Sequence, residues 1–81
     1  MLSIKKFEAS WCQPCKMLSA VMDDMTIEYP VTKVDVDEDQ EQTAKYGIRG
    51  VPTLILLENG QEVKRKSGMM TKEQLEEFLK V

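Results

Sequence analysis

The two cysteines of the chain are Cys12 and Cys15, and they lie in the segment SWCQPCKML, residues 10 to 18. A pair at this spacing could bind a metal, close a small disulfide loop, or exchange electrons with another thiol or disulfide. A structural zinc site takes four ligands, whereas the chain has two cysteines and no histidine. A disulfide that closes so short a loop ties no distant elements together and adds little stability. We therefore favour redox chemistry for this pair.

The residues around the pair predict how that chemistry would proceed. The pair lies between a predicted strand and a predicted helix, so Cys12 would lie at the helix N-terminus, where unpaired N–H groups and the helix dipole stabilise a thiolate. Pro14 falls in the first turn, where its missing N–H costs nothing. We predict that the Cys12 thiolate attacks a substrate disulfide and that Cys15, one turn further along, displaces the reduced product from the mixed disulfide.

The elements that would position this pair follow from the spacing of the apolar residues. Alternating apolar residues predict strands over residues 2–8 and 30–37, and an apolar run predicts a third over 52–58. The polar segment 61–67 follows the Asn-Gly turn and is predicted as the returning strand. Helical spacing and terminal signals predict helices over residues 16–25, 37–47 and 71–80. Pro30 should end the first helix, because the residue before a proline is driven away from the helical conformation.

This order, β-α-β-α-β-β-α, predicts a single α/β domain over residues 1–81. The first two strands should be parallel and joined by a right-handed crossover. The last two should form an antiparallel hairpin through the Asn-Gly turn. Strand 52–58 is apolar on both faces and should be central, whereas the lysine-rich strand 61–67 suits a sheet edge. We therefore expect a mixed four-stranded sheet with helices on its faces. The last helix should begin with a capping box formed by Thr71 and Gln74.

The composition bounds the partners of this 81-residue chain. Its 14 acidic and 11 basic residues give a net charge of −3, which gives no reason to expect nucleic acid or an anionic membrane as a partner. The N-terminal segment MLSIKKFEAS has no long apolar stretch and no small-residue cleavage site, so we expect no signal peptide. The longest apolar run, residues 54–57, is far too short to span a bilayer. We therefore expect a cytoplasmic protein, whose thiols are kept reduced.

Two separated motifs resemble the thioredoxin family. The segment WCQPCKM resembles the active-site segment of that family, and KYGIRGVPTLILLENGQ resembles the stretch that carries its cis-proline. Gly68 and the last helix match as well, so the resemblance covers nearly the whole chain. It implies a thioredoxin-like fold in which Cys12 is the nucleophile and Cys15 the resolving thiol. Pro52 would be cis and lie beside them, and the backbone of Val51 would pair with an extended substrate segment.

The resemblance also implies partners. The chain would be a monomeric electron carrier that reduces protein disulfides and draws electrons from an NADPH-dependent thioredoxin reductase. It would bind no cofactor and no metal, and it would cycle through a reversible Cys12–Cys15 disulfide. Trp11 and Arg49 would lie at the rim of its docking surface. Two alternatives stay open: a glutaredoxin-like protein reduced by glutathione, and a redox-inert binding module with the same fold.

The sequence departs from the family pattern in three places. The N-terminal strand and helix of ordinary thioredoxins are expected to be absent, and Gln13 replaces the usual glycine between the cysteines. Lys6 takes the place of a buried aspartate beneath the resolving cysteine, and Glu8 that of a second tryptophan. Lys6 and Glu8 share one face of their strand, so our hypothesis is that they pair and, with Lys33, replace the proton carrier. The alternative is that Lys6 extends its ammonium group to water.

Overall fold

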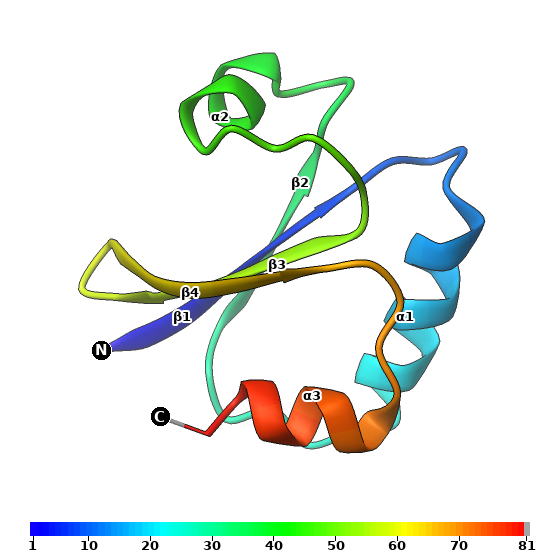
Figure 1. The fold of residues 1–81 in the computed structure, drawn as a ribbon, viewed down its shortest axis with the longest axis vertical. Helices are drawn as coiled ribbons and strands as arrows, with labels where there is room; N and C mark the ends of the chain where they lie inside the picture. The colour runs from blue at the N-terminus through cyan, green and yellow to red at the C-terminus, as the bar shows by residue number, and fades with distance from the viewer. Residues whose placement is uncertain (81) are drawn as a thin grey trace.

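The computed structural model describes residues 1–80, and these form a mixed four-stranded sheet flanked by helices (Figure 1). The elements in chain order are β1 (Leu2–Glu8), α1 (Gln13–Asp23), β2 (Val31–Asp35), α2 (Gln40–Lys45), β3 (Thr53–Glu58), β4 (Gln61–Ser67) and α3 (Lys72–Phe78). The strand order across the sheet is β2-β1-β3-β4. β1 runs parallel to β2, whereas β3 is antiparallel to both β1 and β4. The predicted fold class is confirmed.

Two layers of apolar side chains cover the two faces of the sheet. α1 and α3 lie over one face, and α2 lies over the other (Figure 1). Successive side chains of a strand point to opposite faces, so β3 contributes Leu54 and Leu56 to the first layer and Ile55 and Leu57 to the second. All four side chains are buried. This double burial confirms that β3 is a central strand.

The first helix ends earlier than the sequence predicted. α1 stops at Asp23, with Asp24 as its C-cap, and the chain then reaches Pro30 through a loop. The prediction that Pro30 ends the helix is therefore wrong. Two acidic residues at the C-terminus of a helix oppose its dipole, and the last turn has no basic residue to offset them. Pro30 instead begins the pairing of β2, since its carbonyl accepts a hydrogen bond from Ile4 at 2.9 Å.

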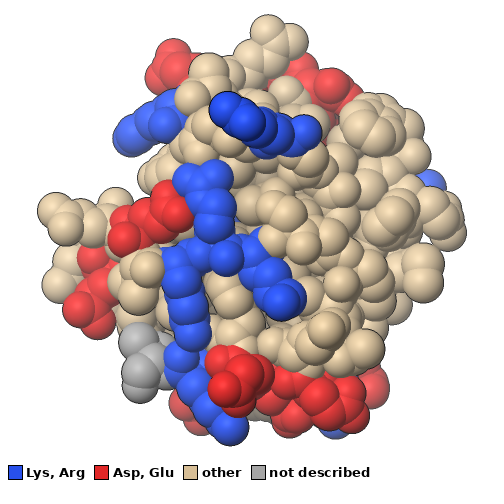
Figure 2. All heavy atoms as spheres, viewed as in Figure 1, with Lys and Arg blue, Asp and Glu red and all other residues tan. Residues whose placement is uncertain are grey.

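The hairpin and the last helix follow the sequence closely. Asn59 and Gly60 both have positive φ, at 52° and 85°, as the predicted turn requires. β4 lies at the sheet edge and is mostly exposed, and Figure 2 shows lysine and arginine side chains gathered over it. The capping box of Thr71 and Gln74 forms at the start of α3. Within residues 1–80, no helix has the length and apolar composition needed to cross a bilayer.

Candidate functional site

The two cysteines meet at the N-terminus of α1. Cys12 is the N-cap, with an extended backbone, and its sulfur accepts a hydrogen bond from the backbone N–H of Cys15 at 3.1 Å. The two sulfur atoms form a disulfide, and the Cα atoms are 5.2 Å apart. Pro14 lies in the first turn of the helix, where its missing N–H leaves no bond unmade. The sequence therefore starts the helix at the pair itself.

The loop before β3 packs against the disulfide. The peptide bond between Val51 and Pro52 is cis, and Pro52 is buried. Val51 packs against the small apolar cluster that contains both cysteines. The carbonyl of Pro52 accepts a hydrogen bond from the Gly68 N–H at 2.8 Å, which ties the end of β4 to this loop. Residues far apart in the sequence thus enclose one side of the cysteine pair.

Trp11 lies on the surface beside the pair. Its side chain is 68% exposed, and its Nε1 donates a hydrogen bond to the carboxylate of Asp37 at 2.8 Å. Trp11, Arg49 and Val51 line the same hollow of about 210 Å³, so the residues expected at the docking rim lie together. Asp37 was not among the predicted site residues, although an indole N–H commonly finds an acceptor and the segment 35–39 is rich in acids.

A second hollow, which Cys15 helps to line, has a volume of about 320 Å³. Its lining residues are Glu8, Ala9, Ser10, Cys15, Lys16, Ser19 and Asp35. Cys15 contributes to this wall although its side chain is only 2% exposed. Ser19 and Asp35 were missed by sequence reasoning, because a serine inside a helix and an aspartate at a strand end have no distinctive spacing. Cys15 therefore shares this hollow with polar side chains.

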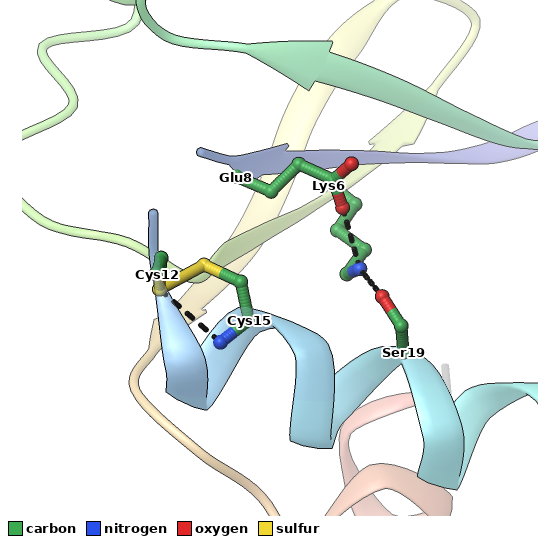
Figure 3. A network of polar contacts seen from close by, with 5 residues as sticks. All are labelled: Lys6, Glu8, Cys12, Cys15 and Ser19. Carbon is green, nitrogen blue, oxygen red and sulfur yellow. Dashed lines mark hydrogen bonds and ion pairs between the residues drawn. A yellow bond between two sulfur atoms is a disulfide. The ribbon is translucent and has the colours of Figure 1, made fainter. Parts of the chain in front are cut away.

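Lys6 and Glu8 form a charged pair beneath the helix. The ammonium group of Lys6 donates to Glu8 Oε1 at 2.6 Å and to the hydroxyl of Ser19 on α1 (Figure 3). Only 1% of the Lys6 side chain is exposed, against 27% for Glu8. Lys6 therefore does not extend to water, and that alternative is wrong. Lys33 lies beside Lys6 in the register of β1 and β2 and lines a further hollow with it.

The start of α2 is fixed by an ionised side chain. Asp39 is its N-cap and accepts hydrogen bonds from the backbone and side-chain nitrogens of Gln42. The backbone hydrogen bond, followed by the side-chain one, lowers the pKa of Asp39 below its ordinary value of 3.8. α2 has no buried residue, so such polar contacts matter for holding it in place. One of its residues, Thr43, lines the hollow beside Trp11.

This arrangement defines a class of protein. A disulfide at a helix N-terminus, next to a cis-proline loop and a hollow lined by an exposed tryptophan, is suited to thiol-disulfide exchange with another molecule. Among residues 1–80, no group of three or more histidine, cysteine, aspartate or glutamate side chains could hold a metal ion.

Comparison with known proteins identifies the family. The family model described as Thioredoxin matches residues 2–81. The chain is 42% identical over 77 residues to a thioredoxin of Buchnera aphidicola subsp. Baizongia pistaciae, covering 90% of this chain and 71% of that protein. It is 43% identical over 75 residues to a thioredoxin of Pseudomonas aeruginosa, covering 88% and 69%.

Solved structures agree with the sequence relatives. A single-substitution mutant of thioredoxin from Halobacterium salinarum NRC-1 superposes with a TM-score of 0.88 at 36% identity, covering 96% of this chain and 71% of that one. A Fasciola hepatica thioredoxin gives a TM-score of 0.86 at 33% identity, covering 96% and 77%. The chain belongs to the thioredoxin family. It is a dithiol oxidoreductase whose redox group is the Cys12–Cys15 pair and whose family uses no cofactor.

Proposed function

We propose that the chain reduces protein disulfides, with Cys12 as the attacking sulfur and Cys15 as the resolving one. The observation that carries this assignment is the hydrogen bond from the Cys15 N–H to the Cys12 sulfur at the N-cap of α1. After reduction, the same N–H and the positive end of the helix dipole would stabilise a thiolate on Cys12. Cys15 lies one turn inside the helix, so its sulfur does not occupy the N-cap position. Pro14 supports the site from the first turn of α1, between the two cysteines in the sequence.

The docking surface in this proposal is the face that carries Trp11, Arg49 and Val51. The three residues line one hollow next to the disulfide, and an exposed indole offers a large contact area to a partner. The backbone of Val51 would pair with an extended segment of the substrate, which is a form of strand addition. Pro52, buried behind that segment, would hold the loop against the two sulfurs.

Membership of the family implies exchange with a thioredoxin reductase and with disulfide substrates. We infer that the electron source is an NADPH-dependent thioredoxin reductase rather than glutathione. We further infer that the chain works as a monomer of one domain over residues 1–81, in the cytoplasm, where such dithiols are kept reduced. The relatives described above are thioredoxins, which favours this electron source over the glutaredoxin-like alternative.

The electron source can be tested with insulin as the disulfide substrate. With NADPH and a bacterial thioredoxin reductase, we expect continuous oxidation of NADPH that depends on this chain. With NADPH, glutathione and glutathione reductase, the rate should stay at the level measured without the chain. The Cys12→Ser variant is the matched control for both arms. NADPH oxidation that depends on this chain in the arm with glutathione and glutathione reductase would contradict the proposed electron source.

A further inference from the structure

We propose that Glu8 is the proton acceptor for the Cys15 thiol and that Lys6 positions the Glu8 carboxylate for this task. The inference rests on the proposed role of Cys15 as the resolving sulfur and adds a residue to it. Glu8 and Lys6 come from the same strand, β1, and they lie on the face of the sheet that α1 covers (Figure 3).

Cys15 needs help to lose its proton. Its side chain is 2% exposed and packs with Ala9 and Cys12 in an apolar cluster. Burial in apolar surroundings disfavours the charged form of a thiol, whereas only the thiolate attacks a disulfide. The backbone N–H of Cys15 points to Cys12 and gives no support to its own sulfur. A neighbouring group must therefore accept the proton before Cys15 can attack.

The hollow beside Cys15 limits the choice of acceptor. Besides Cys15, its titratable lining residues are Glu8, Lys16 and Asp35. A lysine ammonium has no lone pair with which to accept a proton. Asp35 Oδ1 accepts two hydrogen bonds, from the backbone N–H groups of Asp37 at 2.8 Å and Glu38 at 3.3 Å, and so holds the turn after β2, whereas Glu8 Oε1 accepts one, from Lys6. Glu8 remains, and a volume of about 320 Å³ is ample for water to link it to the sulfur.

Lys6 fixes the place of the Glu8 carboxylate. One ammonium N–H binds Glu8 Oε1 and another binds the Ser19 hydroxyl, so the charged end of Lys6 is held between β1 and α1. Lys6 binds one carboxylate oxygen and leaves the second for a proton. Because Ser19 and Glu8 both line the hollow that Cys15 lines, the pair is anchored at its wall.

Other charged groups surround this pair. Asp35 on β2 is the register neighbour of Glu8, and Lys33 is the register neighbour of Lys6. Lys16 on α1 lines the same hollow. The β3 residue beside Lys6 is Leu54, which is apolar and fully buried. The cations Lys6 and Lys16 favour a developing negative charge on the Cys15 sulfur.

The proposed step balances as follows. In the mixed disulfide, Cys12 is bonded to a substrate sulfur and Cys15 is a thiol. The Cys15 proton passes through water to Glu8, and the resulting thiolate attacks the Cys12 sulfur. The bond between Cys12 and the substrate breaks, and its electron pair leaves on the substrate thiolate, which takes up a proton from Glu8 or water. Cys12 and Cys15 are thereby oxidised to a disulfide, and the substrate is reduced.

A matched pair of variants isolates the Glu8 carboxylate. Glu8→Gln alone would leave the buried ammonium of Lys6 without its counter-ion and could fail to fold. The comparison is therefore Lys6→Met, which keeps the carboxylate, against Lys6→Met combined with Glu8→Gln, which lacks it. Neither leaves a charge buried at position 6. Glu58→Gln makes the same chemical change at an exposed residue at the opposite end of the sheet, and Asp35→Asn tests the other carboxylate in the hollow.

The assay mixes each reduced protein with excess bis(2-hydroxyethyl) disulfide, quenches with acid at intervals and follows the species by mass. The rate of appearance of the mixed disulfide reports attack by Cys12, and the rate of its conversion to the intramolecular disulfide reports attack by Cys15. If neither the mixed disulfide nor the intramolecular disulfide forms, the proposed role of Cys12 fails. If the mixed disulfide forms at equal rates in all variants, the rate of its conversion to the intramolecular disulfide tests Glu8 independently of Cys12.

At about pH 7, we expect the double variant to convert the mixed disulfide at least about tenfold more slowly than the parent. The deficit should shrink towards about pH 9, where hydroxide replaces the missing base for a thiol whose ordinary pKa is about 8.5. Lys6→Met should lie between the two, because its carboxylate is present but unanchored. Conversion rates that are the same in Lys6→Met and the double variant at every pH would overturn the proposal. So would a deficit found in Asp35→Asn but not in the double variant.

Discussion

Lys6 and Glu8 share one ion pair but differ sharply in their access to water. The Lys6 side chain is 1% exposed and that of Glu8 is 27% exposed. If Lys6 is removed, the carboxylate that remains can still be hydrated. If Glu8 is removed, an ammonium group is left in the interior with the Ser19 hydroxyl as its hydrogen-bond partner. The two substitutions should therefore have unequal effects on stability.

We predict that Glu8→Ala lowers the free energy of unfolding by about 3–5 kcal/mol, the cost of leaving a buried charge unpaired. Lys6→Met, which replaces the ammonium by an apolar group of similar length, should change it by less than about 1.5 kcal/mol in either direction. Urea unfolding of both variants beside the parent measures the difference. Equal losses in the two variants would mean that burial of the Lys6 charge does not decide the stability of the pair.

At the scale of the element, α2 depends on polar contacts for its position. It has no buried residue, and Gln42 links it to β1 through a hydrogen bond from Lys5. Tyr46, its C-cap, packs against Phe7 with ring centroids 5.7 Å apart. Because Thr43 of α2 lines the hollow beside Trp11, the stability of this helix bears on the proposed docking surface.

Loss of the α2 N-cap should therefore be measurable. Asp39→Ala removes the acceptor of two hydrogen bonds from Gln42, and we expect a several-fold larger unfolding equilibrium constant at neutral pH. The folded-state pKa of Asp39 is lowered, so its contribution is fully present above the ordinary value of 3.8. It is lost as the pH falls through the lower, folded-state value.

Urea unfolding of Asp39→Ala and the parent at several pH values tests this dependence. The difference in stability should stay constant near neutral pH and shrink as the pH falls below the ordinary pKa of 3.8 and through the lower, folded-state pKa of Asp39. A difference that is unchanged in acid would show that the carboxylate charge does not support the cap.

At the scale of the whole molecule, local patterns predicted most of the architecture. The continuous apolar run of β3, the Asn59–Gly60 turn and the capping box of α3 are signals contained in a few neighbouring residues. The predicted end of α1 lies too late in the chain, because the proline rule at Pro30 neglects the acidic residues before it. The end of a helix depends on several local preferences that compete, so a single residue such as Pro30 does not decide it.

The candidate site was predictable only where its signal lies in neighbouring residues. The spacing of Cys12 and Cys15 is visible in the sequence, whereas Ser19 and Asp37 enter the site through contacts between distant elements. The complete burial of Lys6 also depends on how α1 packs over β1, since a lysine on a strand can equally extend to water. Long-range contacts of polar side chains require the assembled fold.

The most direct test of the central claim is to identify which sulfur attacks. Purified Cys15→Ser and Cys12→Ser variants are each reduced, mixed with insulin, quenched with acid and analysed by mass for a covalent adduct. Attack by Cys12 predicts a stable mixed disulfide on Cys12 in the first variant and none in the second over the same time, because Cys15 lacks the helix N-cap position. An adduct that forms through Cys15 while Cys12 is absent, at a comparable rate, would contradict the assignment of the attacking and resolving sulfurs.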